Sequence, residues 1–221
     1  MAERRLLDTT DLFAALPEEV IDSLREHAVV RHLARNDVLF QQGDASSALY
    51  VIDQGRIAIA THSNDGRESV FAVLEDGDLL GELPLFDDEP RNADARALVD
   101  TTVTELQYEP VRDVLRQRPE LLWVIVRLLV QRLRTTNEAL TDAVFLDVPA
   151  RTAKRLLELS GNESRFTLPV TQEELAAMVG ASRERVNKAI SLFVRLGWLE
   201  LEGRNNYKIL DREALDDRAT L

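Results

Sequence analysis

The sequence predicts an α+β protein with an N-terminal antiparallel β-roll, a long helix and a C-terminal winged helix-turn-helix. Three observations support this prediction. Residues 29–106 alternate apolar and polar positions between Gly-centred turns, as the strands of an antiparallel roll do. From residue 111 to about 145 the apolar period is that of a helix. Two short amphipathic helices on either side of Gly180 follow, and a hairpin comes after them.

The composition is that of a globular protein, and it excludes several kinds of site. The chain has 221 residues, of which 45% are hydrophobic and 30% charged, and this length favours two domains. No apolar run approaches the roughly 18 residues of a membrane span, so we expect a cytoplasmic protein with no membrane partner. The absence of Cys excludes disulfides, thiolate zinc sites and Cys-ligated iron–sulfur clusters. His27, His32 and His62 are too scattered to predict a metal site.

The N-terminal roll is predicted to follow a short amphipathic helix at about residues 17–27. Its turns are spaced 12, 11 and 11 residues apart, which suits hairpins in an antiparallel sandwich or roll. The turns lie at Gly43-Asp44, Gly55, Asp65-Gly66 and Asp76-Gly77. The clearest strands are residues 49–52, 56–60 and 102–106.

The long helix carries an apolar heptad seam. After an interruption at Pro119, the seam positions recur in alternating steps of four and three residues. Either the helix pairs with a second copy of the chain or it packs only on its own roll, and we favour a homodimer. Thr136 is a polar position on the seam, so it is a candidate for fixing the register or for contacting a ligand. The seam comprises Leu122, Val126, Leu129, Leu133, Thr136, Leu140 and Ala143.

The chain therefore divides into four predicted segments. Residues 1–110 form the roll with its N-terminal helix, and residues 111–146 form the dimerisation helix. Residues 147–149 are the hinge, because the residue before Pro149 is disfavoured in a helix. Residues 150–221 form the winged helix-turn-helix domain, which starts with a helix that ends at about Ser160.

The last segment has the sequence signals of a helix-turn-helix. Thr171 and Glu174 form a capping box, and Gly180 provides the turn. The second helix has apolar positions facing inward and an outer face of side chains that can bind base edges or phosphate. The alternative is a plain amphipathic helix pair with a solvated charged face. The predicted DNA-binding residues are Ser182, which caps the second helix, then Arg183, Glu184, Arg185, Asn187 and Lys188, with Arg204 at the tip of the following hairpin, the wing.

The charges are distributed unevenly along the chain. The net charge is -12, but residues 1–149 carry -13 and residues 150–221 carry +1. Binding to nucleic acid requires clustered Lys and Arg to neutralise phosphates, so the acidic segment cannot be a DNA surface. The sequence therefore assigns double-stranded DNA as a partner of the C-terminal segment.

Two further motifs give the chain a family resemblance. Gly81-Glu82-Leu83 and Pro90-Arg91-Asn92-Ala93 resemble the phosphate-binding cassette of cyclic-nucleotide-binding domains. With the helix-turn-helix downstream, the chain from about residue 12 to 210 resembles the CRP/FNR superfamily of bacterial transcription regulators, in pattern its cAMP-sensing members. The resemblance implies a homodimeric, non-enzymatic regulator that binds a near-palindromic operator, contacts RNA polymerase and responds to cAMP.

The resemblance also implies roles in a nucleotide pocket. Gly81 and Leu83 would lend backbone groups near the ribose and the phosphate. Glu82 would accept a hydrogen bond from the ribose 2′-hydroxyl, and Arg91 would pair with the cyclic phosphate. Asn92 stands where cAMP-sensing members usually carry Ser or Thr, so its amide would have to donate instead.

Three more positions bear on the effector. Thr136 and Asn137 match the place from which cAMP-sensing members contact adenine, whereas Asp94 adds a negative charge that would weaken nucleotide binding unless it points outward. The alternative is an effector-independent regulator with a vestigial pocket, in which Glu82 and Arg91 form an internal ion pair. Haem sensing lacks the Cys ligand, and no His lies in the fitting segment. A cyclic-nucleotide hydrolase would need a metal cluster or a nucleophile–base pair that the sequence does not supply.

Overall fold

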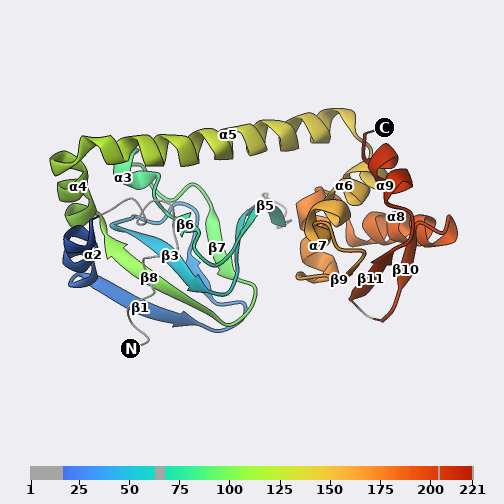
Figure 1. The fold of residues 1–221 in the computed structure, drawn as a ribbon, viewed down its shortest axis with the longest axis horizontal. Helices are drawn as coiled ribbons and strands as arrows, with labels where there is room; N and C mark the ends of the chain where they lie inside the picture. Colours follow the sequence, from blue (N-terminus) through green and yellow to red (C-terminus); the bar gives the residue numbers. More distant parts are fainter. Residues whose placement is uncertain (1–16, 63–67, 204, 221) are drawn as a thin grey trace. The chain divides into compact units, whose positions relative to one another are not determined.

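The computed structural model describes residues 17–62, 68–203 and 205–220, which form two compact units (Figure 1). The first unit ends at Leu133 and the second begins at Arg134, so the division falls within helix α5 (Leu122–Phe145). Residues 68–70 are grouped with the second unit. The functional segments proposed from the sequence, 1–110, 111–146, 147–149 and 150–221, stay predictions.

Two antiparallel sheets make up the β-structure of the first unit, as the sequence predicts. The first sheet has the strand order β1-β8-β3-β6 and the second has the order β2-β7-β4-β5. The first sheet consists of β1 (Ala28–Leu33), β8 (Thr101–Gln107), β3 (Ala48–Gln54) and β6 (Leu79–Leu80). The second consists of β2 (Val38–Phe40), β7 (Asp94–Ala97), β4 (Ile57–His62) and β5 (Glu68–Leu74).

The central strand β3 is buried on both faces, because successive side chains of a strand point to opposite sides. Tyr50 and Ile52 belong to a core with residues of both sheets, among them Ala95 of β7. Leu49 and Val51 face a second core, which includes residues of the surrounding helices. The roll therefore has one apolar layer between its sheets and another between its first sheet and the helices.

The turn at Gly55 shows why glycine is needed there. Its φ is +115°, and an added Cβ would lie 2.4 Å from Oγ1 of Thr101, which is closer than any side chain allows. Gly43 and Gly77 also have positive φ, in agreement with the predicted turns. The predicted turn at Asp65-Gly66 lies outside the described residues.

The first unit also contains helices, one of which directly follows the first motif of the predicted cassette. The structure adds a one-turn helix after Glu82 that the sequence did not predict, because four residues are too few to show a period. Pro119 interrupts the helical region, as predicted. The elements are α2 (Glu18–Arg25), α3 (Pro84–Asp87), α4 (Tyr108–Gln117), η2 (Pro119–Leu121) and α5 (Leu122–Phe145).

The second unit is a helix-turn-helix with a three-stranded sheet in the order β10-β11-β9. The capping box of Thr171 and Glu174 is present, and Gly180 ends the first helix in the left-handed conformation, as predicted. Strand β9 and the last helix were not predicted. The elements are α6 (Val148–Ser160), β9 (Arg165–Thr167), α7 (Gln172–Val179), α8 (Arg183–Arg195), β10 (Leu199–Leu201), β11 (Asn206–Ile209) and α9 (Arg212–Ala219).

The start of α6 differs from the expectation of a helix from about Ala150. The helix begins at Val148, because Pro149 is tolerated in a first turn, where its missing N–H is not required. Asp147 caps this turn by accepting from the amide of Ala150 at 2.9 Å. Arg218 of α9 donates to both carboxylate oxygens of Asp147 at 2.6 Å, so the predicted hinge is tied to the second unit. None of the described helices has the length and apolar character required to cross a membrane.

Candidate functional site

The cassette begins where β6 ends, at Gly81. This residue has a φ of +74°, and an added Cβ would lie 2.3 Å from Nη1 of Arg91. Only glycine therefore allows the backbone to approach the guanidinium this closely. Glu82 and Leu83 follow and lead directly into α3, so the first motif and Arg91 are brought together as the sequence predicts.

Arg91 is a buried cation whose partners among the described residues are all neutral. Its side chain donates from Nη1 to the carbonyl oxygen of Gly81 at 2.8 Å and from Nη2 to that of Ala48 at 2.6 Å. Nη1 also donates to the Tyr108 hydroxyl at 3.2 Å, and the guanidinium lies 4.1 Å from the ring centroid of Phe40. Its Nε is buried without a hydrogen-bond partner, and no described carboxylate pairs with it. Such a buried charge is stabilised when an anion reaches it.

Glu82 is also buried, with 2% of its surface exposed, but it has a counter-ion. Its carboxylate accepts from Nη1 of Arg132 on α5 at 2.5 Å, and Arg132 also donates to the carbonyl oxygen of Leu79. The alternative ion pair between Glu82 and Arg91 is therefore wrong, because the arginine of the long helix takes that place. Sequence reasoning missed Arg132, although it lies one helical turn before Thr136.

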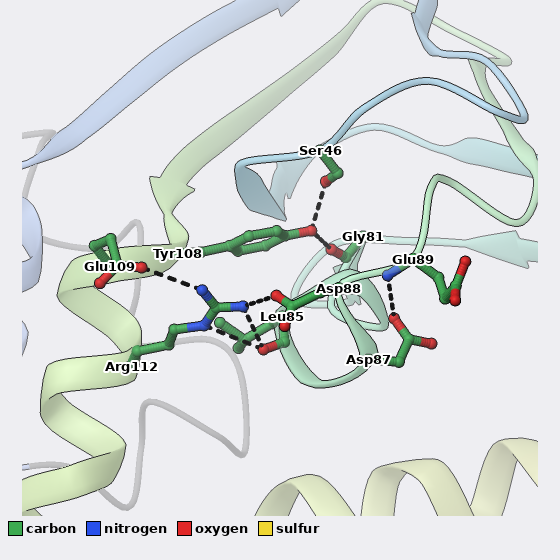
Figure 2. Close-up of polar contacts among 9 residues, drawn as sticks. All are labelled: Ser46, Gly81, Leu85, Asp87, Asp88, Glu89, Tyr108, Glu109 and Arg112. Atoms are coloured by element: carbon green, nitrogen blue, oxygen red, sulfur yellow. Dashed lines mark hydrogen bonds and ion pairs between the residues drawn. The ribbon is translucent and has the colours of Figure 1, made fainter.

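Tyr108 bonds Gly81 and Ser46, as Figure 2 shows, and its hydroxyl also accepts from Nη1 of Arg91 in the second motif. Its hydroxyl donates to the carbonyl oxygen of Gly81 at 2.6 Å and forms a 2.6 Å hydrogen bond with Oγ of Ser46. Burial raises the pKa of the Tyr108 hydroxyl, so it remains a neutral donor. A tyrosine at the start of a helix gives no distinctive sequence signal, and it was not predicted.

Asn92 and Asp94 are the two departures from the expected cassette. Asn92 is exposed. One carboxylate oxygen of Asp94 accepts from the amide of Gln42 at 2.6 Å, and the other lies 2.7 Å from Nδ1 of His62. The charge that was expected to oppose a nucleotide is therefore engaged by these two groups.

Thr136 and Asn137 lie in the part of α5 that belongs to the second unit. Both side chains are exposed, and the carbonyl oxygen of Asn137 accepts from Oγ1 of Thr141 at 2.9 Å. Their predicted contact with a base stays a prediction.

Helix α5 has one apolar face on the roll and another that is exposed in the single chain. Ile125 is buried, and Leu128 packs against the core formed by the roll and α4. Leu133 and Leu140 of the predicted seam are 60% and 62% exposed. Further exposed apolar side chains on this helix are Leu122, Trp123, Val126, Val130, Val144 and Phe145.

The second helix of the helix-turn-helix, α8, presents its predicted polar face to solvent. Ser182 caps it by accepting from the amide of Arg185 at 3.4 Å. Arg183, Glu184, Arg185 and Lys188 are exposed on its surface, and Asn187 is partly buried. Arg204 of the predicted wing lies outside the described residues. The inward face is buried through Val186, Ala189, Ile190 and Phe193, as the helical spacing predicts.

The charges on α8 differ in how far they are paired. Lys188 lies 2.7 Å from the carboxylate of Glu184 one turn earlier and lowers its pKa. The side chains of Arg183, Arg185 and Arg195 have no hydrogen-bond or ion-pair partner within the described part of the chain. The other described Lys and Arg side chains of residues 150–220 each contact a carboxylate, hydroxyl or carbonyl oxygen. Cations free to bind phosphate therefore gather on this helix.

One perturbed carboxyl group lies apart from both sites. Burial raises the pKa of Asp53 on β3 to about 6, and Oγ1 of Thr104 donates to it at 2.8 Å. Its other oxygen is buried without a partner. Among the residues that the structure describes, no group of three His, Cys, Asp or Glu side chains could hold a metal ion.

Comparisons with known proteins match both sites. Residues 30–118 match the family described as cyclic nucleotide-binding domain, and residues 150–218 match the Crp-like helix-turn-helix domain. A "CRP-like cAMP-activated global transcriptional regulator" of Mycobacterium tuberculosis is 35% identical over 97% of this chain and 98% of its own. The "cAMP-activated global transcriptional regulator Vfr" of Pseudomonas aeruginosa is 31% identical over 83% and 91%.

Among solved structures, the "c-di-GMP Responsive Global Regulator CLP" of Xanthomonas campestris has a TM-score of 0.77 and 25% identity. The match covers 87% of this chain and 99% of that one. These relatives are transcription regulators, not enzymes. Their names differ in the nucleotide to which each responds.

Proposed function

This chain belongs to the CRP/FNR family of transcription regulators, and on that basis we propose that it is a homodimeric, sequence-specific DNA-binding regulator controlled by cAMP in its β-roll. It would act in the cytoplasm on double-stranded DNA and would contact RNA polymerase there. The observation that carries the effector proposal is Arg91, a buried guanidinium with no acidic partner among the described residues and with an unpartnered Nε.

The charge of the pocket favours a cyclic mononucleotide over a dinucleotide. Arg91 donates to the carbonyl oxygen of Gly81 and has no acidic partner among the described residues, whereas Glu82 neutralises Arg132. One uncompensated positive charge remains, which matches the single negative charge of a cyclic phosphodiester. A cyclic dinucleotide carries two such charges. The 35% identity to a relative described as cAMP-activated supports the same choice.

The remaining groups of the pocket suit the other parts of cAMP. Arg91 would bind the phosphate, with backbone groups of Gly81 and Leu83 nearby, and the buried carboxylate of Glu82 would accept from the ribose hydroxyl. The exposed amide of Asn92 would donate to the phosphate. Thr136 and Asn137 would contact the adenine. Thr136 lies one turn after Arg132 on the same helix.

The exposed apolar face of α5 supports pairing with a second copy. Soluble chains rarely leave such a stripe in water, and Leu133, Leu140 and Trp123 are each at least 60% exposed. Seam residues at heptad spacing are the surface that two parallel helices bury. A homodimer would place two α8 helices about 34–36 Å apart, to enter successive major grooves of a near-palindromic operator.

Control by an effector requires that the DNA-competent conformation binds the effector more tightly than the other conformation does. The ion pair of Glu82 with Arg132 gives the cassette a direct bond to α5. A ribose hydroxyl that binds Glu82 would share this carboxylate with Arg132 and would change the charge density at their ion pair. The helix that carries the proposed dimer seam would respond to that change.

Calorimetric titration with cAMP, followed by operator binding with and without cAMP, tests the proposal. We expect saturable binding and tighter operator binding in its presence. Arg91→Met should abolish the heat of binding while helix content is retained, and cyclic di-GMP serves as the competing effector. Absence of heat together with unchanged operator affinity would contradict control by cAMP.

An effector-independent regulator is the second candidate, and one observation favours it. Arg91 already makes three hydrogen bonds inside the protein, to Gly81, Ala48 and Tyr108. A vestigial pocket could keep these bonds as part of the fold. In that case operator affinity would be the same with and without cAMP, and Arg91→Met would change stability alone.

A further inference from the structure

Helix α4 contacts both ends of the segment from Gly81 to Asp88. Tyr108, its first residue, donates to the carbonyl oxygen of Gly81 at 2.6 Å. Arg112, one turn later, donates through Nε and Nη2 to the carbonyl oxygen of Leu85 at 3.3 and 3.1 Å. The same guanidinium forms an ion pair with Asp88 directly after α3 (Figure 2). The segment from Gly81 to Asp88 is thus held to α4 at its start and at its end.

Helix α3 depends on contacts of this kind because it has a single turn. It comprises four residues, and helices this short are not stable from their own hydrogen bonds. Asp88 ends it in the left-handed conformation with a φ of +56°. Because α3 ends at Asp87, the carbonyl oxygen of Leu85 has no helical amide to accept from. The guanidinium of Arg112 donates to it instead.

An apolar contact between α3 and α4 accompanies the polar contacts of Arg112. Leu85 belongs to the same core as Tyr108 and Val111 of α4, and Leu128 of α5 packs against that core. A displacement of α3 would therefore change the packing of α4 and of α5 at Leu128. The bonds of Arg112 to Leu85 and Asp88 are directional, whereas apolar packing is not.

We propose that Arg112 is a positioning residue for the effector response: by binding the end of α3, it makes the cassette and α4 move as one body when Arg91 takes up its anion. Arg112 acts through α3 and contacts no effector itself. This inference rests on the proposed control by a cyclic nucleotide, and it adds the residue that transmits occupancy of the pocket to the helices.

Three substitutions separate this role from a general effect of charge. Arg112→Gln removes the guanidinium, and Asp88→Asn removes one of its partners while keeping a residue that tolerates a left-handed backbone. Arg116→Gln is the matched control. Arg116 lies four residues further along α4 and pairs with Asp113 at 2.9 Å, just as Arg112 pairs with Glu109 at 3.1 Å, but it has no bond to α3.

Amide hydrogen exchange of the ligand-free protein, resolved by NMR, tests the clamp without any effector. The amides of Phe86 and Asp88 donate within α3 to Leu83 and Pro84. We expect these two to exchange about threefold to tenfold faster in Arg112→Gln, less so in Asp88→Asn, and at the wild-type rate in Arg116→Gln. Unchanged exchange in Arg112→Gln, or an equal increase in Arg116→Gln, would overturn the positioning role.

The second measurement is the ratio of operator affinities with and without saturating cAMP. Arg112→Gln and Asp88→Asn should lower this ratio about threefold to tenfold, while Arg116→Gln retains it. A wild-type ratio in both clamp variants would overturn the inference, even if their melting temperatures fall. If the wild-type protein itself neither binds cAMP nor changes its operator affinity, the proposed function fails, and the exchange rates still decide whether Arg112 holds α3.

Discussion

At the scale of single residues, the two buried charges of the cassette are stabilised in different ways. Glu82 has a counter-ion in Arg132, whereas Arg91 relies on carbonyl oxygens and on the ring of Phe40. Hydrogen bonds and a ring face compensate a guanidinium only in part, because its charge is unneutralised. The residue best placed to bind an anion is therefore the one whose charge the fold leaves uncompensated.

The free arginines of α8 lead to a prediction about DNA recognition. Arg183→Ala should weaken binding by about 1–3 kcal/mol at one operator position and relax the base preference there, since a guanidinium in the major groove bonds guanine edges. Arg185→Ala should weaken binding equally on all sequences and lower the salt slope by about one. Binding to a set of single-base operator variants at several salt concentrations distinguishes the two. A uniform loss for Arg183→Ala would make it a phosphate contact.

Asp53 leads to a prediction about pH. Burial raises its pKa from 3.8 to about 6, so the folded chain holds this proton more tightly than the unfolded chain does. The free energy of unfolding should therefore fall as pH rises from about 4 to about 6, by roughly 1–2 kcal/mol after allowance for partial exposure. Urea unfolding of wild type and Asp53→Asn across this range measures the difference. Parallel curves would show that Asp53 is not the group responsible.

At the scale of elements, α5 has two apolar faces with different partners. Ile125 and Leu128 face the roll, and the stripe through Leu133 and Leu140 is exposed in the single chain. A helix that only covered its own roll would not need the second face, because a polar outer surface is sufficient for a one-sided helix. The exposed stripe is the physical basis for expecting a partner helix.

Leu140→Asp tests that expectation. A carboxylate on the seam would be buried twice in a symmetric pair, so the dissociation constant of the dimer should rise by about 100-fold or more, to give monomers at micromolar concentration. Leu210→Asp, at a residue outside α5 that is 50% exposed, is the control and should leave the assembly unchanged. Sedimentation velocity gives the masses. A monomeric wild-type protein, or a dimeric Leu140→Asp variant, would contradict pairing through this seam.

At the scale of the whole molecule, the charge distribution limits how the protein can bind DNA. The chain has a net charge of -12, and residues 150–221 contribute only +1. We therefore expect weak nonspecific attraction to phosphates, and in the proposed dimer high affinity would come from two recognition helices that bind together. The proposed pairing through α5 would in this sense be part of DNA recognition.

Operator spacing tests this dependence. Inserting five base pairs between the half-sites turns one of them by about half a helical turn, so a dimer with fixed spacing should lose at least about tenfold in affinity. The operator would first be obtained by selection from random duplexes, and electrophoretic mobility shifts would measure binding to both versions. Equal affinity for the two spacings would show that each recognition helix binds independently.

Much of the fold could be predicted because the signals are local. The period-two strands, the heptad seam, the capping box of Thr171 and Glu174 and the cap at Ser182 depend on neighbours within a few residues. The elements that were missed, α3, β9 and α9, are either too short to show a period or gain their order from other parts of the chain. β9, for example, is three residues long and pairs with β11.

The sequence by itself determined the α+β fold and the polar face of α8, because residue type and spacing encode both, and its resemblance to a known family indicated the cassette motif around Arg91. Only the tertiary structure decided that Arg132 pairs with Glu82, that Tyr108 bonds Gly81 and that Arg112 holds α3. These partners lie between 27 and 50 residues apart along the chain. Packing of the helices on the roll brings them together, and no local pattern records which of several buried charges and donors will meet.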